Sequence, residues 1–364
     1  MTANNYRIKI HISRNNTIRG TFKGIPYKNS RPEVGDTVTF KCQTVLIEAI
    51  RSKKMSVQEV LFNEQNSLYR QIIKCILFLY LKNNCWVKLN KIEILRFTKS
   101  TRDLPYSIEI DKYNQPIKAN FSLRYTIPDS VLDFIWKESV EGEFLRTISS
   151  HWLSALASEY RLYIFEQLWR TFEQLAFYAN RTSHSNTEFD AIKNMKAYIW
   201  NHVDSFPEAI NDARRISGKN FRDFDWKGYV QNEFPTLAIS NKSKPYTEKF
   251  QNNFVLCNRD LRVVNMLEKI LSLRSAELMK FGVYDNVNNH INTLLLLKET
   301  HDEQLLTMLC CKYAYYFRNK MFHGEVLSHS FTFSDKTVEN KRVDILNTLL
   351  QSLTTDLILI FDSL

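Results

Sequence analysis

The spacing of apolar residues divides the chain into a first third of mixed pattern and a longer helical part. From Tyr6 to Ile12 apolar and polar residues alternate, which is the period of a half-buried β-strand. Further segments rich in β-branched residues are also expected to be strands. They are Thr37–Phe40, Gln43–Ile50, Lys91–Phe97, Tyr106–Ile110 and Ile117–Tyr125, with a hairpin connection at Asp111–Pro116.

One long helix is expected within this first third. Apolar residues recur at helical spacing from Val60 to Leu79, which predicts a helix over Ser56–Lys82. Ser56, followed three residues later by Glu59, is typical of a capping box at a helix start. The pattern therefore predicts an α+β domain over residues 1–126, ended by Ile127-Pro128-Asp129.

Residues 127–364 are expected to form an all-α bundle. Their apolar residues follow a 3.6-residue period, and Glu143–Tyr178 is expected as one bent helix or two. The other expected helices are Glu188–Val203, Pro207–Ile216, Arg259–Phe281, Val287–Leu297, Glu303–Phe322 and Val338–Phe361. Residues 217–258, with Pro235, Pro245 and a polar run, are predicted to be a loop-rich insertion.

Composition limits the classes of protein that fit. With 44% hydrophobic and 24% charged residues the chain is globular, and its longest apolar run, Cys75–Leu81, is much shorter than the ~20 residues of a membrane span. The start Met1–Tyr6 has no secretory pattern, so we expect a cytoplasmic protein without a membrane partner. The six cysteines lack zinc-site spacing, and no Gly-rich phosphate loop is present, so no metal or cofactor is expected.

The net charge of +10 lies entirely in the first third. Met1–Tyr125 contains 22 Lys and Arg against 9 Asp and Glu, whereas the remainder contains 49 − 22 = 27 basic and 39 − 9 = 30 acidic residues. This asymmetry indicates either a surface that meets nucleic acid or another polyanion, or a basic surface that serves solubility.

The candidate catalytic residues lie in the segment Arg318-Asn319-Lys320-Met321-Phe322-His323-Gly324. It ends an amphipathic helix, and Gly324 provides the stop. Five residues correspond to about 140° of helical rotation, so Arg318 and His323 share a site only if the helix ends or bends between them. Arg146 and His151 have the same spacing but lack the aromatic run, the Asn and the Gly, which favours a structural role for that pair.

This segment resembles the motif of the HEPN superfamily, many of whose members are metal-independent ribonucleases of toxin, antiviral-defence and RNA-processing systems. Trp169-Arg-Thr-Phe-Glu173-Gln-Leu175 also resembles an early-helix pattern of these bundles, and a last apolar helix over Asp344–Phe361 fits. The resemblance covers about Val131–Leu364. It implies a homodimer in which two motifs form one cleft.

The residue types suit RNA cleavage without a metal, because the 2′-hydroxyl of RNA supplies the nucleophile. His323 is expected to exchange protons, and Arg318 to bind two phosphoryl oxygens. Asn319 is expected to orient the histidine or hold the phosphate. Glu173 either positions Arg318 or His323 or is an exposed helix carboxylate, and Lys320 is either a solvated charge or a further phosphate contact.

Three functions remain open from the sequence. The first is an RNA endonuclease whose basic first third recognises RNA or responds to a regulatory trigger or partner protein. The second is a non-catalytic HEPN-like module that binds a nucleotide or a partner and dimerises. The third, a DNA-binding regulator, is less favoured because the first third contains no recognisable helix-turn-helix.

Overall fold

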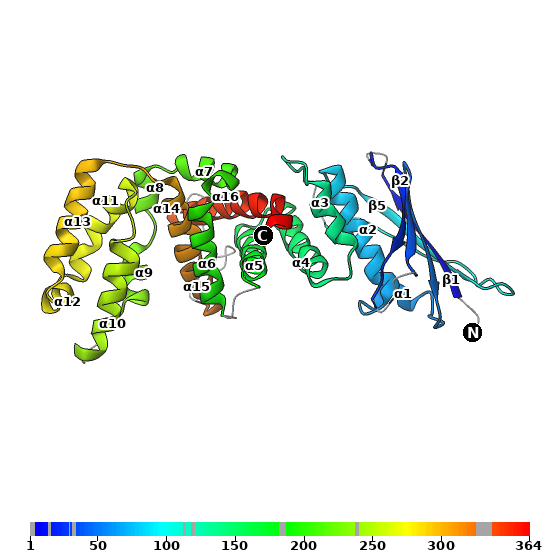
Figure 1. Ribbon diagram of the computed structural model, residues 1–364. Coiled ribbons are helices and arrows are strands. Elements are labelled where there is room, and N and C mark those ends of the chain that lie inside the picture. The colour runs from blue at the N-terminus through cyan, green and yellow to red at the C-terminus, as the bar shows by residue number, and fades with distance from the viewer. Residues whose placement is uncertain are drawn as a thin grey trace. The chain divides into compact units, whose positions relative to one another are not determined.

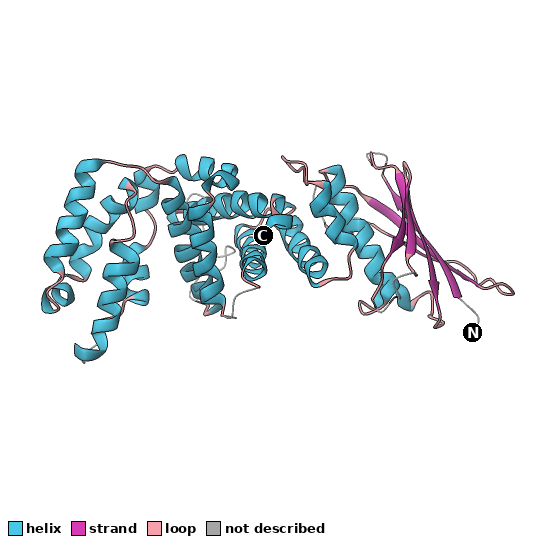
Figure 2. Ribbon diagram, in the orientation of Figure 1, coloured by secondary structure: helices cyan, strands magenta, loops and turns pink. Residues whose placement is uncertain are grey.

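The computed structural model describes residues 4–13, 16–28, 30, 34–111, 114–117, 121–181, 187–236, 240–324 and 337–364. The chain forms two compact units (Figure 1). Unit 1 consists of Met1–Tyr160 together with Ile358–Leu364, and unit 2 consists of Arg161–Leu357. Unit 1 combines a sheet with helices, and the elements described in unit 2 are all helical (Figure 2). The expected mixed α+β class is confirmed at this level.

The sheet of unit 1 has six antiparallel strands in the order β2-β3-β4-β1-β5-β6. They are β1 (Asn4–Ile12), β2 (Gly20–Ile25), β3 (Asp36–Phe40), β4 (Thr44–Arg51), β5 (Leu89–Phe97) and β6 (Tyr106–Glu109). Central strand β1 pairs Ile8 with Ile47 of β4 and with Ile94 of β5. All three isoleucines are fully buried, so the alternation read in the sequence places one face of the sheet in the core.

Five of the six expected strands are present, and β2 was not predicted. Gly20 and Gly24 interrupt the apolar alternation of β2 and leave little pattern to read. The expected strand Ile117–Tyr125 is wrong over Phe121–Tyr125, which forms only an isolated bridge between Ser122 and Cys85. Residues 118–120 of this strand, and 112–113 of the expected hairpin, lie outside the described residues.

The expected long helix is two helices, α1 (Glu59–Phe62) and α2 (Ser67–Asn83), and the predicted capping box is wrong. The N-cap of α1 is Gln58, without a side-chain cap. The polar residues between the helices form a turn, in which Asn66 caps α2 by accepting a hydrogen bond from the amide of Leu68 at 2.9 Å. Helix α2 covers the buried face of the sheet (Figure 2). On this face the rings of Phe78 and Phe40 lie 5.4 Å apart.

The helices that follow the sheet are grouped with unit 1, whose first segment runs to Tyr160, and the domain boundary near Ile127 stays a prediction. These are α3 (Asp129–Leu132), η1 (Asp133–Trp136) and α4 (Val140–Leu156), joined by the C-terminal turn η7 (Phe361–Ser363). Their attachment to α2 is specific. The buried Lys74 ammonium of α2 pairs with Glu138 at 2.6 Å and donates to the Trp136 carbonyl at 3.2 Å.

Unit 2 begins with α5 (Arg161–Ala179), so the expected helix Glu143–Tyr178 is two helices, broken at Ala157–Tyr160. The elements that follow are α6 (Glu188–Asn201), η2 (Val203–Ser205), α7 (Pro207–Arg214), α8 (Gly218–Arg222), α9 (Trp226–Glu233), α10 (Ser240–Phe250), the π turn η3 (Gln251–Val255), α11 (Leu261–Ile270), η4 (Leu271–Leu273), α12 (Ser275–Lys280), α13 (Tyr284–Leu297), α14 (Asp302–Thr307), the π turn η5 (Met308–Tyr313), α15 (Ala314–Phe322) and α16 (Val338–Leu359).

The prediction of a loop-rich insertion over 217–258 is wrong, because α8, α9, α10 and η3 occupy most of the described part of this interval. Pro245 lies inside α10, so this proline did not exclude a helix. Buried aromatic residues hold these short helices together. Trp226 and Tyr229 of α9 have ring centres 5.7 Å apart, and Tyr229 lies 5.4 Å from Phe254 of η3. Tertiary packing therefore determined the helical state against a polar local sequence.

Candidate active site

The predicted motif lies at the end of one continuous helical segment. Helix α14 leads through the π turn η5 into α15, whose last helical residue is Phe322. His323 is the C-cap, and its amide donates to the Asn319 carbonyl at 3.0 Å. Gly324 follows with φ +71°, a left-handed conformation that favours glycine. The helix thus ends at Phe322, with His323 as its C-cap, and the left-handed residue comes directly after His323. That Arg318 and His323 share a site stays a prediction.

Arg318 lies between two carboxylates from different helices. Its Nη2 is 4.0 Å from Glu173 Oε1 of α5 and 3.8 Å from Glu188 Oε1 of α6. Its Nη1 donates to Asn319 Oδ1 at 3.0 Å, and its guanidinium lies 4.4 Å from the centre of the Phe322 ring. The structure therefore brings together three of the predicted residues, Arg318, Asn319 and Glu173.

The aromatic side chains of α5 and α15 fix this arrangement. Phe165 of α5 meets Phe317 edge-on, with ring centres 4.9 Å apart, and Trp169 lies 6.1 Å from Tyr315. Phe165, Trp169 and Phe317 are all buried. Since Trp169 and Glu173 are four residues apart, they lie on the same face of α5, and the packing of the tryptophan directs the carboxylate to α15.

The carboxylates of Glu173 and Glu188 both face the Arg318 guanidinium. Burial, and after it the neighbouring Glu188 carboxylate, raise the pKa of Glu173 to about 7 against the opposing effect of Arg318. The Glu173 carboxyl group therefore keeps its proton to a higher pH than a solvated glutamate does. This places a group that can exchange protons beside Arg318.

Glu188 was not anticipated from the sequence. It occupies the first turn of α6, after Thr187, whose side chain caps the helix by accepting from the amide of Asp190. Thr187 and Asp190 mark a helix start, and an acidic residue in a first turn is usually explained by the helix dipole. Only the fold shows that this carboxylate also faces Arg318.

Lys320 and His323 differ from the Arg318 cluster in their surroundings. The Lys320 ammonium is 3.8 Å from Asp225 Oδ2, at the N-terminus of α9, and 5.2 Å from the centre of the Tyr316 ring. These contacts identify Lys320 as an ion-pair partner of Asp225 rather than as a solvated charge. The side chain of His323 is exposed at the helix end.

Arg146, which has the same spacing from His151 as Arg318 has from His323, binds main-chain carbonyls of unit 1. Arg146 Nη1 donates to the carbonyls of Ile135 and Lys137 at 3.1 and 2.6 Å. These carbonyls lie at the end of η1, so Arg146 connects α4 to the preceding turn. The structural reading of Arg146 agrees with these contacts.

No family model, no curated protein and no solved structure matches this chain. Over the described ranges, no helix has the length and apolar character needed to cross a bilayer. Within the same ranges, no group of three or more His, Cys, Asp and Glu side chains is arranged to hold a metal ion. The six cysteines are free thiols.

Proposed function

We propose that this protein is a metal-independent RNA endonuclease of HEPN type, with Arg318 and His323 as its catalytic residues. The 2′-hydroxyl oxygen attacks the adjacent phosphorus, the bond to the 5′-oxygen breaks, and the products are a 2′,3′-cyclic phosphate and a 5′-hydroxyl. His323 transfers the proton, and Arg318 stabilises the additional negative charge on the phosphoryl oxygens.

The state of the Arg318 guanidinium is the observation that carries the proposal. Both carboxylates lie beyond hydrogen-bond distance, so they orient the cation without occupying its N–H groups. Nη1 bonds to Asn319, no hydrogen-bond acceptor among the described residues takes Nη2, and 26% of the Arg318 side chain is exposed. An oriented guanidinium whose Nη2 is not taken by another acceptor is suited to receive a phosphate.

The supporting residues have defined parts in this proposal. Asn319 and Glu173 are positioning residues that act through Arg318, and Glu188 joins them. Lys320, paired with Asp225 and 34% exposed, is the candidate for a further phosphate contact. By the resemblance to the HEPN family, two protomers join their motifs in one cleft, and the enzyme works in the cytoplasm as a toxin or antiviral-defence effector. The basic first third then recognises RNA or responds to a trigger.

Cleavage of total cellular RNA in the presence of EDTA tests the assignment. We expect Arg318→Ala and His323→Ala each to reduce the rate by at least about 100-fold, the range typical of charge stabilisation and general acid–base catalysis. His151→Ala is the matched control, because this histidine has the same spacing from an arginine, and it should cut as the wild type does. Normal cleavage by either motif variant would contradict the proposal.

The alternative is a non-catalytic module that binds a nucleotide or a partner protein. It would be favoured if the wild-type protein bound RNA or nucleotides but yielded no cyclic-phosphate ends from any cellular RNA. A cavity in unit 2, separate from the Arg318 cluster, makes nucleotide binding a question in its own right.

A further inference from the structure

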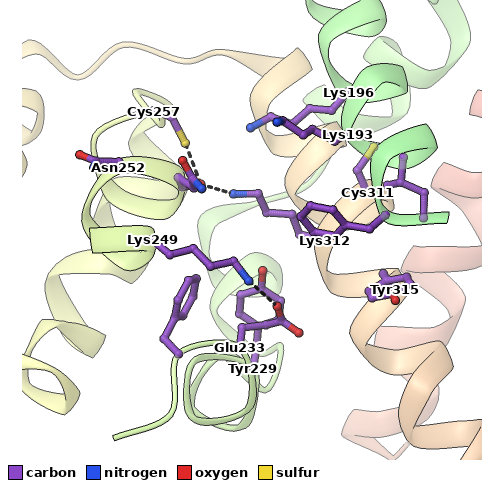
Figure 3. Close-up of a pocket in the computed structure, with 14 residues that line it drawn as sticks. Lys193, Lys196, Tyr229, Glu233, Lys249, Asn252, Cys257, Cys311, Lys312 and Tyr315 are labelled. Carbon is purple, nitrogen blue, oxygen red and sulfur yellow. Dashed lines mark hydrogen bonds and ion pairs between the residues drawn. The ribbon is translucent and has the colours of Figure 1, made fainter. Parts of the chain in front are cut away.

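A cavity of about 300 Å³ opens between four helical segments of unit 2 (Figure 3). It lies between α6, α9, the segment α10–η3 and the segment η5–α15. The two π turns face each other across it, because the Lys312 ammonium of η5 donates a hydrogen bond to the Asn253 carbonyl of η3. π turns widen a helix locally and recur at functional sites.

The lining of this cavity is strongly basic. Four lysines line it, Lys193, Lys196, Lys249 and Lys312, and Glu233 is the single acidic side chain among the lining residues. The formal charge of the lining is therefore 4 − 1 = +3. Glu233 lies 3.5 Å from the Lys249 ammonium, so it neutralises one lysine and leaves three. An apolar cavity with this excess of ammonium groups favours an anionic ligand.

Lys312 is the most unusual of the four lysines. Burial, together with the ammonium groups of Lys196 and Lys249, lowers its pKa to about 8. The cationic form is thus held at a cost, and among the described residues the main-chain carbonyl of Asn253 accepts its hydrogen bond. An anion in the cavity would stabilise this charge.

Aromatic rings form the other part of the wall. Phe189, Tyr229, Phe234 and Tyr315 line the cavity, and Figure 3 shows Tyr229 beside the Glu233–Lys249 pair. The Lys249 ammonium lies 5.9 Å from the Phe189 ring centre and 5.6 Å from that of Phe234. The side chains of Asn252 and Asn253 add amide donors and acceptors. The wall therefore offers stacking surfaces and polar groups next to the basic region.

We propose that this cavity binds a nucleotide, with its phosphate at the lysines and its base against the aromatic side chains. A phosphate alone would leave the rings unused, and an uncharged aromatic ligand would leave the lysines unused. The volume is at the lower end of ligand pockets, which fits one nucleotide rather than a strand of RNA. This inference does not depend on the ribonuclease activity proposed for Arg318 and His323.

Isothermal titration calorimetry with the full chain tests the proposal. The probes are the four common ribonucleoside 5′-monophosphates, the matching nucleosides and inorganic phosphate. We expect at least one monophosphate to bind about tenfold or more tightly than its nucleoside and than phosphate, because charge-assisted hydrogen bonds are lost with either part. Lys312→Met should weaken that binding by about tenfold or more.

Two further variants keep the test decisive. Lys196→Gln changes a second lining lysine and serves if Lys312→Met fails to fold, and it should also weaken binding. Lys269→Met is the matched control, because Lys269 is an exposed lysine of α11 outside the cavity, and its binding should equal that of the wild type. Absence of binding by all four monophosphates, or binding by the lysine variants of the cavity that equals that of the wild type, would overturn the proposal.

Discussion

Among single residues, Glu173 shows most clearly how the Arg318 cluster departs from ordinary surface chemistry. Two carboxylates face one guanidinium, and burial disfavours a second negative charge. The protein therefore holds a proton on Glu173 at a pH where a solvated glutamate has lost it. Once Glu173 has lost this proton, the cluster of Glu173, Glu188 and Arg318 is net negative, which opposes the approach of an RNA phosphate.

We predict that Glu173→Gln makes thermal stability less dependent on pH. The folded state raises the pKa of Glu173 from 4.5 to about 7, so its stabilising contribution is complete below pH ~4.5 and is lost as the pH rises through 7. Glutamine is neutral throughout. The melting temperature of the variant should match the wild type near pH 5 and exceed it by about 2–6 °C at pH 8.5.

Differential scanning calorimetry between pH 5 and pH 8.5 measures this difference. Glu268→Gln, which changes an exposed carboxylate of α11, is the control and should follow the wild-type curve at every pH. Parallel curves for Glu173→Gln and the wild type would show that Glu173 is an ordinary ionised carboxylate.

At the scale of elements, the end of α15 sets the position of His323, the proposed catalytic histidine. The amide of Gly324 donates to the Met321 carbonyl at 3.1 Å, and its φ of +71° reverses the chain directly after His323. Gly282 does the same at the end of α12, with φ +69° and a bond to the Met279 carbonyl at 3.0 Å. Among the described residues other than the chain neighbours, no atom lies within 4 Å of a Cβ built at either glycine, so substitution introduces strain without a clash with these residues.

We predict that Gly324→Ala and Gly282→Ala each lower the free energy of unfolding by about 1 kcal/mol, because both place a side chain in the left-handed region. Only Gly324→Ala should also reduce RNA cleavage, since only this glycine adjoins His323. Denaturant titration and cleavage rates measure the two effects. Equal cleavage by both variants would show that the helix end does not position the histidine.

The elements also show what the sequence could and could not predict. Alternation predicted β1, and helical spacing with Gly324 predicted that α15 ends at the motif, because burial of one face leaves a period in the sequence. The π turn at Met308–Tyr313 was not predictable, because a change of hydrogen-bond register leaves no such period. Glu188 lies far from Arg318 along the chain, and the other cavity lysines lie far from Lys312. Only packing brings these residues together.

At the scale of the whole molecule, the excess of basic residues and the two candidate sites lie in different units. The basic excess lies in the first third, whereas the Arg318 cluster and the lysine-lined cavity belong to unit 2. On the sheet of unit 1 several charges form opposite pairs, such as Arg7 with Glu48 at 3.0 Å and Lys91 with Glu93 at 3.0 Å. These pairs cancel locally, and since both members are already included in the count, the net excess of the first third comes from its other basic residues.

The last prediction concerns the dimer implied by the HEPN resemblance. If two motifs form one cleft, an inactive chain inactivates its wild-type partner. After subunit exchange in an equal mixture of wild type and Arg318→Ala, only wild-type pairs remain active, which is about a quarter of all dimers. If each chain acts alone, about half of the activity remains. Initial cleavage rates, with sedimentation velocity to verify mixed dimers, distinguish the two results. A mixture of wild type with active Lys269→Met should retain its full rate, which shows that exchange itself does no harm.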